Sequence, residues 1–172
     1  MEPRLPIGHL IPKPLMLMQE VEAEIAQSCL EPALLHLVKM RASQINGCAY
    51  CLDMHSKDAR AEGESEQRLY ALDAWDETPF FTDRERAALL WTEAVTRVSE
   101  NHVPASVYEA VRGEFTDQEL AYLTLAAATI NAWNRLNVAL RTVPGEYRPG
   151  MFRRLREGPS QQGARTAATS PR

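Results

Sequence analysis

The sequence predicts an all-α fold, a compact helical bundle of about six to seven helices. Apolar residues recur every three or four positions along most of the 172 residues, as on the buried face of a helix. The alternation of apolar and polar residues that is typical of strands has no convincing example. Two capping boxes, Thr82 with Glu85 and Thr116 with Glu119, mark helix starts. We therefore expect helices packed on helices.

The first half of the chain is expected to form an extended segment and four helices. Four prolines among residues 1–14 predict the extended N-terminal segment, and helical spacing then begins at residues 15–28. A second, strongly apolar helix begins at a proline and covers residues 32–47. The third helix covers residues 48–63, where a glycine ends it, and a short fourth one covers residues 65–72.

The second half is expected to add three helices and a tail. The helices begin at Thr82, Pro104 and Thr116, and the last is long, ending at about Arg141. Residues 151–172 are polar and of low complexity, which predicts a disordered tail. One helical domain over residues 15–150 is therefore the expected organisation.

Composition and charge exclude several function classes. The net charge of −4 and the lack of a long basic run within the folded part argue against nucleic-acid binding. Residues 1–14 resemble neither a secretory signal nor a membrane span, and three cysteines are too few for a secreted disulfide scaffold. We therefore expect a cytoplasmic protein that does not enter membranes.

The stretch from Leu120 to Leu140 is apolar on nearly all sides of the predicted helix. Polar side chains within it, including Asn134 and Arg135, exclude a membrane span. A helix that is apolar all round is usually the centre of a bundle or part of a subunit interface. This stretch therefore predicts a homo-oligomer.

The sequence Asn46-Gly47-Cys48-Ala49-Tyr50-Cys51-Leu52-Asp53-Met54-His55 predicts a redox site. Thiols three positions apart can form a disulfide, and His55 lies one helical turn beyond Cys51, where it can take up the Cys51 proton. The Asn-Gly turn places Cys48 at a helix start, where backbone N–H groups favour a thiolate. Position at the helix start favours Cys48 as the reactive thiol, whereas proximity to His55 favours Cys51.

Two other interpretations of the cysteine pair are possible. The pair could bind zinc with His55, but a fourth ligand from His36, Cys29 or Asp53 would be needed, and no second Cys-x-x-Cys is present. The two cysteines could also be inert buried residues. We expect redox chemistry with neither cofactor nor metal.

Several residues outside the motif are expected to have structural roles. Cys29 is predicted to be a small buried residue, and Asp53 to complement the start of its helix. The remaining predictions are core positions for Met16, Met18 and Met40, and packing or interhelical amide bonds for Asn131, Trp133 and Asn134, with pocket lining as the less favoured alternative.

The block from Val38 to Arg60 resembles the AhpD-like alkylhydroperoxidase branch of the carboxymuconolactone decarboxylase family. A second block, beginning Thr129-Ile-Asn-Ala-Trp-Asn-Arg-Leu, is similar to a later stretch of that branch. The resemblance covers roughly residues 15 to 150. It implies an all-helical subunit, trimers or hexamers, and reduction of peroxides by a cysteine pair.

The resemblance places Cys48, Cys51 and His55 on the family's redox motif. In similar proteins a glutamate twelve residues before the first cysteine supports the histidine, and here that position is His36. Counting back from the turn places His36 opposite His55 on antiparallel helices. Neutral His36 could accept a hydrogen bond from His55, although it supplies no negative charge.

The combined prediction is a cysteine-based antioxidant peroxidase. Cys51, ionised with the help of His55, attacks a peroxide and becomes a sulfenic acid, which Cys48 resolves to a disulfide. An external dithiol then reduces the disulfide. One alternative is a redox-sensing or stress-linked interaction protein with little turnover. A decarboxylase-like enzyme is less favoured, because members of the decarboxylase branch that gives the family its name lack the cysteine pair.

Overall fold

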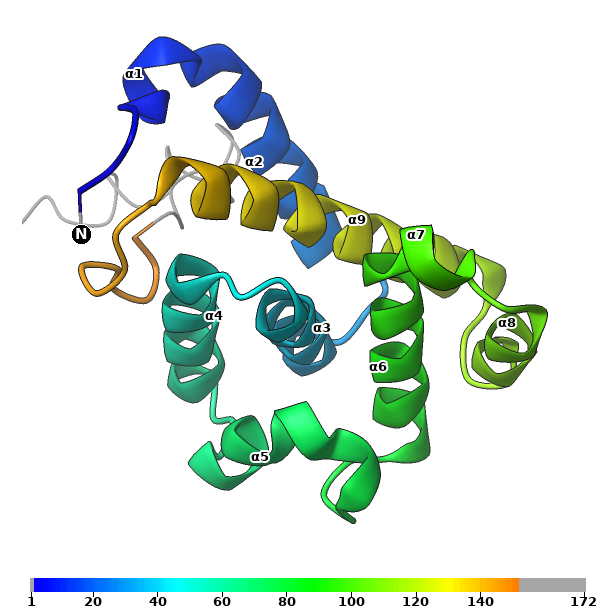
Figure 1. Cartoon of the computed structure of the whole chain (residues 1–172). Coiled ribbons are helices and arrows are strands. Elements are labelled where there is room, and N and C mark those ends of the chain that lie inside the picture. The colour runs from blue at the N-terminus through cyan, green and yellow to red at the C-terminus, as the bar shows by residue number, and fades with distance from the viewer. Residues whose placement is uncertain (1, 152–172) are drawn as a thin grey trace, which may run out of the picture.

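The computed structural model describes residues 2–151, so nearly all of the predicted disordered tail lies outside the described residues. Figure 1 shows an all-α arrangement, as predicted, and residues 2–151 contain no strand. The helices are α1 (Ile7–Leu10), α2 (Pro12–Ala26), α3 (Pro32–Ile45), α4 (Ala49–Ala61), α5 (Glu66–Ala71), α6 (Asp83–Thr96), α7 (Val98–Asn101), α8 (Ala105–Arg112) and α9 (Asp117–Leu140), with a 3₁₀ helix η1 (Leu72–Glu77) after α5.

Helix α3 lies at the centre of the molecule. Figure 1 shows α4 and α6 on opposite sides of α3, while α9 crosses above it. All residues from 34 to 43 are buried, including three that carry basic side chains. The stretch from Leu120 to Leu140, which we expected to be central or at an interface, packs the buried face of α9 against α2, α3, α4, α6 and α8.

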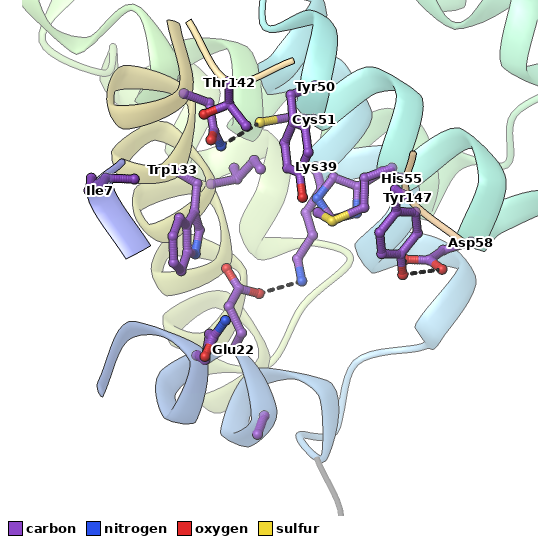
Figure 2. A pocket seen from close by; sticks show the side chains of 15 residues that line it. Ile7, Glu22, Lys39, Tyr50, Cys51, His55, Asp58, Trp133, Thr142 and Tyr147 are labelled. Atoms are coloured by element: carbon purple, nitrogen blue, oxygen red, sulfur yellow. Dashed lines mark hydrogen bonds and ion pairs between the residues drawn. The ribbon is translucent and has the colours of Figure 1, made fainter. Parts of the chain in front are cut away.

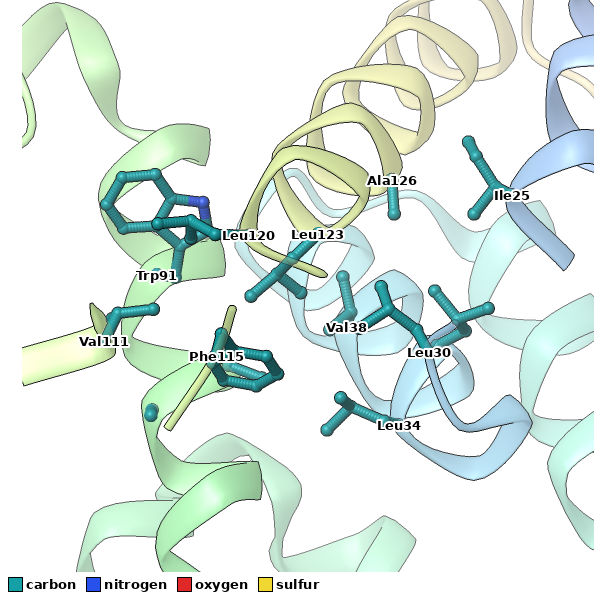
Figure 3. Close-up of a cluster of buried hydrophobic side chains, with 13 residues drawn as sticks. Ile25, Leu30, Leu34, Val38, Trp91, Val111, Phe115, Leu120, Leu123 and Ala126 are labelled. Atoms are coloured by element: carbon teal, nitrogen blue, oxygen red, sulfur yellow. The ribbon is translucent and has the colours of Figure 1, made fainter. Parts of the chain in front are cut away.

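Three clusters of buried apolar side chains form the core. The largest joins α2, α3, α6, α8 and α9, with Val38 and Leu123 fully buried in it (Figure 3). The second lies between α3, α4, α5, η1 and α6. The third joins α3, the start of α4 and α9, and consists of Ala42, Cys48, Cys51 and Ile130. The two thiols are thus part of the core.

Both predicted capping boxes are present. Thr82 Oγ1 accepts a hydrogen bond from the backbone N–H of Glu85, and the Glu85 carboxylate accepts one from the Thr82 N–H. Thr116 and Glu119 form the same pair of bonds at the start of α9. Each pair satisfies two N–H groups that the first helical turn leaves without intrahelical partners.

The N-terminal region differs from the prediction. Residues 1–14 were expected to be extended, but they include the one-turn helix α1, and α2 begins at Pro12. Prolines fit there because the first turn of a helix leaves its N–H groups unpaired. Met16 was expected in the core but is 45% exposed, whereas Ala23 and Ile25 are the buried residues of α2.

The seven predicted helices correspond to α2, α3, α4, α5, α6, α8 and α9. The one-turn helices α1 and α7 and the 3₁₀ helix η1 were not predicted. Within residues 2–151, no helix is both long and apolar enough to cross a membrane.

Candidate redox site

The turn before α4 fixes the position of the first cysteine. Gly47 adopts a left-handed backbone with φ of 63°, which only glycine adopts at little steric cost. Cys48 is the N-cap residue of α4, as predicted, and its Sγ accepts a hydrogen bond from the Cys51 backbone N–H at 3.4 Å. Cys48 and Cys51 are free thiols, and each is 1% exposed.

Buried amides attach this turn to α9. Asn46 Nδ2 lies 2.9 Å from both Asn131 Oδ1 and Asn134 Oδ1, and Asn134 Nδ2 donates to Ser43 Oγ at 3.0 Å. The predicted interhelical amide bonds of Asn131 and Asn134 are confirmed. Because Asn134 is fully buried, these bonds specify the register of α9 against α3 and α4.

The two thiols differ in acidity. The pKa of Cys48 falls from its ordinary value of 9.0 to about 7, mainly because its sulfur accepts a hydrogen bond from the Cys51 thiol. Backbone N–H groups of Tyr50 and Cys51 at the helix start add to this effect against the opposing effect of burial. The pKa of Cys51 is raised, because its proton is held by Cys48 and because it is buried. The first negative charge of the pair therefore resides on Cys48.

A cavity of about 200 Å³ opens onto Cys51 rather than Cys48. Figure 2 shows Cys51, His55 and Trp133 among its walls. Its lining consists of Ile7, Gln19, Glu22, Ala23, Lys39, Tyr50, Cys51, Met54, His55, Asp58, Ile130, Trp133, Asn137, Thr142 and Tyr147. A small molecule in this cavity meets Cys51 first. Pocket lining, the less favoured interpretation of Trp133, is thus what the structure shows, together with packing against the third cluster.

Asn137 is a site residue that the sequence analysis did not single out. Its Nδ2 lies 3.4 Å from Cys51 Sγ, within hydrogen-bonding range for sulfur. This contact favours the Cys51 thiolate and opposes the effects that raise the pKa of this thiol. The available signal was a third asparagine in α9, three residues after Asn134.

His55 and His36 lie next to each other, as predicted. Both are buried, and their ring centroids are 6.4 Å apart with the planes tilted by 53°. His36 Nε2 lies 3.0 Å from Glu62 Oε2, a partner that the sequence analysis did not identify. Burial lowers the pKa of His36 below its ordinary value, and the Glu62 carboxylate opposes that effect.

An ion pair between Lys39 and Glu22 lies on the cavity wall opposite Cys51. Lys39 Nζ donates to Glu22 Oε2 at 2.5 Å, and Lys39 is only 6% exposed (Figure 2). Figure 2 also shows the Tyr147 hydroxyl against the Asp58 carboxylate, whose two oxygens lie 2.8 and 2.9 Å away. The mainly apolar cavity therefore also has charged groups in its wall.

The segment after α9 is attached to α4. Asp53 Oδ2 accepts hydrogen bonds from the Gly145 backbone N–H at 3.0 Å and from Lys57 Nζ at 2.8 Å. Lys57 Nζ also donates to the backbone oxygens of Gly145 and Tyr147. Asp53 therefore holds the C-terminal segment over α4, a role different from the predicted one.

The exposure of Cys29 differs from the prediction. It follows the end of α2 and is exposed, whereas we expected it to be buried. The structure also does not support a zinc site in which His36, Cys29 or Asp53 is the fourth ligand. Among residues 2–151 there is no group of three or more His, Cys, Asp or Glu side chains that could hold a metal ion.

Comparison with known proteins identifies the family. The sequence model of the carboxymuconolactone decarboxylase family matches residues 15–94. The uncharacterized protein YdfG of Bacillus subtilis is 38% identical over 140 residues, which cover 81% of this chain and 95% of YdfG. The chain belongs to the carboxymuconolactone decarboxylase family.

Solved structures place the chain among the AhpD-like members of that family. A protein of unknown function from Agrobacterium tumefaciens, suggested to be an antioxidant defence protein AhpD, matches with a TM-score of 0.82 and 38% identity over 85% of this chain and 100% of its own. A peroxidase-related protein from Ralstonia eutropha, described as an alkylhydroperoxidase AhpD core, gives a TM-score of 0.72 and 19% identity over 81% and 74% of the two chains, which shows the shared fold. The chain is an AhpD-like family member with a Cys-x-x-Cys pair.

Proposed function

We propose that this AhpD-like protein is a thiol-dependent peroxidase that works through Cys48 and Cys51. The observation that carries the proposal is a pair of buried free thiols at a helix start, one of which lines a mainly apolar cavity beside a histidine. Low-pKa thiols react with peroxides through their thiolate form. The size and apolar lining of the cavity suit hydrogen peroxide or a small organic hydroperoxide.

In the first step Cys51 reacts with the peroxide. We assign this role to Cys51 because it lines the cavity, whereas Cys48, the more acidic thiol, does not. The hydrogen bond between the thiols lets the remaining proton move from Cys51 to Cys48, so the ionised pair titrates as a unit. The Cys51 sulfur then forms an S–O bond, the O–O bond breaks, and the leaving oxygen takes a proton to become an alcohol or water.

In the second step Cys48 resolves the sulfenic acid. Its sulfur attacks the Cys51 sulfur, an S–S bond forms, and the hydroxyl group leaves with a proton as water. Two thiols and one peroxide thus yield one disulfide, one alcohol and one water. An external dithiol restores both thiols by exchange, and its oxidised form carries away the two electrons.

His55 is the proton carrier in this scheme. It lines the same cavity as Cys51, one helical turn further along α4. It takes up the proton when the thiol pair ionises and returns one to the leaving oxygen. Asn137 supports the Cys51 thiolate through its hydrogen bond.

The test is peroxide consumption in the presence of dithiothreitol, followed with cumene hydroperoxide and with hydrogen peroxide. We expect many turnovers per protein for the wild type and for Cys29→Ser, and none for Cys48→Ser or Cys51→Ser. Consumption of one equivalent of peroxide per protein, with no further turnover, would indicate a redox sensor instead of a peroxidase. Equal consumption by all four proteins would contradict both assignments.

A further inference from the structure

His36 lies between two separate cavities. On one side its ring is next to that of His55, which lines the cavity with Cys51. On the other side His36 and Glu62 line a second cavity of about 190 Å³, together with Ala33, Ala59, Gly63, Glu64 and Arg68. The Glu62 side chain is 44% exposed, whereas that of His36 is 10% exposed. A path of titratable groups therefore leads from the thiol cavity to solvent.

The contact with Glu62 determines which nitrogen of His36 carries the proton. A carboxylate accepts hydrogen bonds, so neutral His36 holds its proton on Nε2, 3.0 Å from Glu62 Oε2. Nδ1 is then left as an acceptor. It is buried and has no hydrogen-bond partner among residues 2–151. His36 is thus ready to accept a proton on its inner side while Glu62 stabilises the imidazolium that results.

Proton transfer between the two histidine rings depends on the distance between their nitrogen atoms. A direct hydrogen bond needs the two nitrogen atoms about 3 Å apart. Ring centroids 6.4 Å apart leave a gap of the size that one water molecule bridges. A bridging water is therefore part of the relay that we propose for these rings.

Other charged groups around His36 have partners of their own, although Asp58 keeps its negative charge because the Tyr147 hydroxyl is neutral. Lys39, which opposes protonation of His36, is neutralised by Glu22. Asp58, which favours protonation, accepts the Tyr147 hydroxyl. In the second cavity Glu64 pairs with Arg68. Glu62 is the carboxylate that contacts the His36 ring itself.

We propose that Glu62, acting through His36, supplies the negative charge for the histidine pair and connects His55 to solvent. This inference rests on the proposed peroxidase function and adds two positioning residues to it. The proton released when the thiol pair ionises passes from His55 through water to His36, whose Nε2 proton moves to Glu62 and on to solvent. The reverse transfer returns a proton to His55 for the leaving oxygen, so the relay neither gains nor loses a proton in one turnover.

The test compares Glu62→Gln with Glu64→Gln. Both variants remove one negative charge from the second cavity, but only Glu62→Gln removes the carboxylate bonded to His36. NMR titration should show a lower pKa for His36 in Glu62→Gln and an altered titration of His55, with neither change in Glu64→Gln. We expect Glu62→Gln to slow disulfide formation by peroxide about tenfold, below the roughly 10²–10⁴-fold effect of a direct acid or base.

The pH profile separates a relay from a structural role. The rate of thiol alkylation should rise with pH at a higher midpoint in Glu62→Gln than in Glu64→Gln or the wild type, because a less protonated histidine pair stabilises the thiolate less. Unchanged oxidation and alkylation profiles would overturn the proposal, even if His36 titrated differently. An unchanged His36 titration would overturn it as well.

These measurements do not depend on peroxidase turnover. If the wild type consumed no peroxide, the proposed function would fail, while the histidine titrations and the alkylation profile would still decide whether Glu62 is coupled to the thiols. A shifted alkylation midpoint in Glu62→Gln alone would then support the coupling.

Discussion

At the scale of single residues, the two thiols of the motif have different surroundings although they lie three positions apart. Cys48 receives backbone and thiol hydrogen bonds at the helix start, which lower its pKa to about 7. Cys51 faces the cavity and holds the proton that the pair shares. Acidity and access are therefore divided between two cysteines. The argument from the helix start therefore applies to Cys48, and the argument from proximity to His55 applies to Cys51.

Mild peroxide treatment should convert the pair into an intramolecular Cys48–Cys51 disulfide. The three-residue spacing on one helical turn allows closure with little backbone movement. Cys29 is exposed and should remain outside this disulfide, although it should alkylate readily. Peptide mapping after oxidation checks the pairing, and Cys29→Ser is the control. Recovery of a Cys29-linked peptide as the main product would refute the assignment.

Replacing His36 with glutamate should increase the thiolate fraction, because an anion beside His55 favours its imidazolium. In the wild type, however, Glu62 lies against the side chain at position 36. A glutamate at position 36 would therefore be repelled by the Glu62 carboxylate. We therefore expect a small gain in His36→Glu and a larger one in His36→Glu/Glu62→Gln, up to about one unit in the thiol pKa. His55→Ala should have the opposite effect.

Thiol alkylation rates measured against pH test this series. Because the thiolate is the reactive form, a lower thiol pKa raises the rate at pH values below it. If the profiles of wild type, His36→Glu, the double variant and His55→Ala coincided, neither histidine would be coupled to the thiols. The relay would then have to be abandoned.

His36 should also make stability depend on pH. Its pKa is lowered in the folded state, so below the ordinary value of 6.5 the unfolded chain binds more protons than the folded one. The free energy of unfolding therefore falls as pH falls below 6.5, by at most about 1.4 kcal/mol per pH unit from this group. Urea unfolding between pH 5 and 7, roughly the titration range of His, should show a shallower dependence for His36→Gln. Identical slopes would contradict this origin.

At the scale of elements, the turn between α3 and α4 positions the whole site. It must reverse the chain between two packed helices and leave Cys48 at the N-cap. The Asn46 side chain bonds the turn to α9, and Gly47 supplies the left-handed backbone. The sequence signal of an Asn-Gly turn was sufficient to place it.

Gly47→Ala should destabilise the protein by about 1–2 kcal/mol, the cost of a left-handed backbone for an L-residue. The space around Gly47 is open, so the backbone alone accounts for the effect. Gly8→Ala is a matched control, because its surroundings are also open and its φ is not positive. Urea unfolding measures both. Equal stability of the two variants would show that the turn relaxes without cost.

At the scale of the whole molecule, large apolar side chains remain exposed on several elements, among them the two long helices α2 and α9. On α2 these include Met16, Leu17 and Val21, and on α9 they include Leu125 and Val138. Contiguous exposed apolar surface is typical of protein interfaces. Subunit contacts through the outer face of α9 therefore remain our prediction. The exposed face of α2 is a second candidate for such contacts.

We expect light scattering to show a homo-oligomer, a trimer or hexamer, whose contacts use these helices. Deletion of residues 158–172, which lie outside the described residues, should leave the assembly intact. Leu17→Lys should weaken it, because a charge would be buried in an apolar interface. A monomer before and after deletion would contradict the prediction. An intact oligomer in Leu17→Lys would exclude this part of α2 from the interface.

The sequence by itself determined the helices and the central motif. Periodicity, capping boxes and the Asn-Gly turn act between residues fewer than five positions apart, so α3, α4, α6 and α9 were predicted near their observed bounds. The spacing of Cys48, Cys51 and His55 is also local, and the motif identified the branch of the family to which solved structures are similar.

Only the tertiary structure decided which side chains surround that motif. Glu62 reaches His36 from the far end of α4, and Asn137 reaches Cys51 from α9, across 86 positions of sequence. Burial depends on neighbours in the same way, which is why Met16 and Cys29 are exposed although both were expected to be buried. Local signals specify helices, whereas contacts between helices depend on packing that no short stretch of sequence contains.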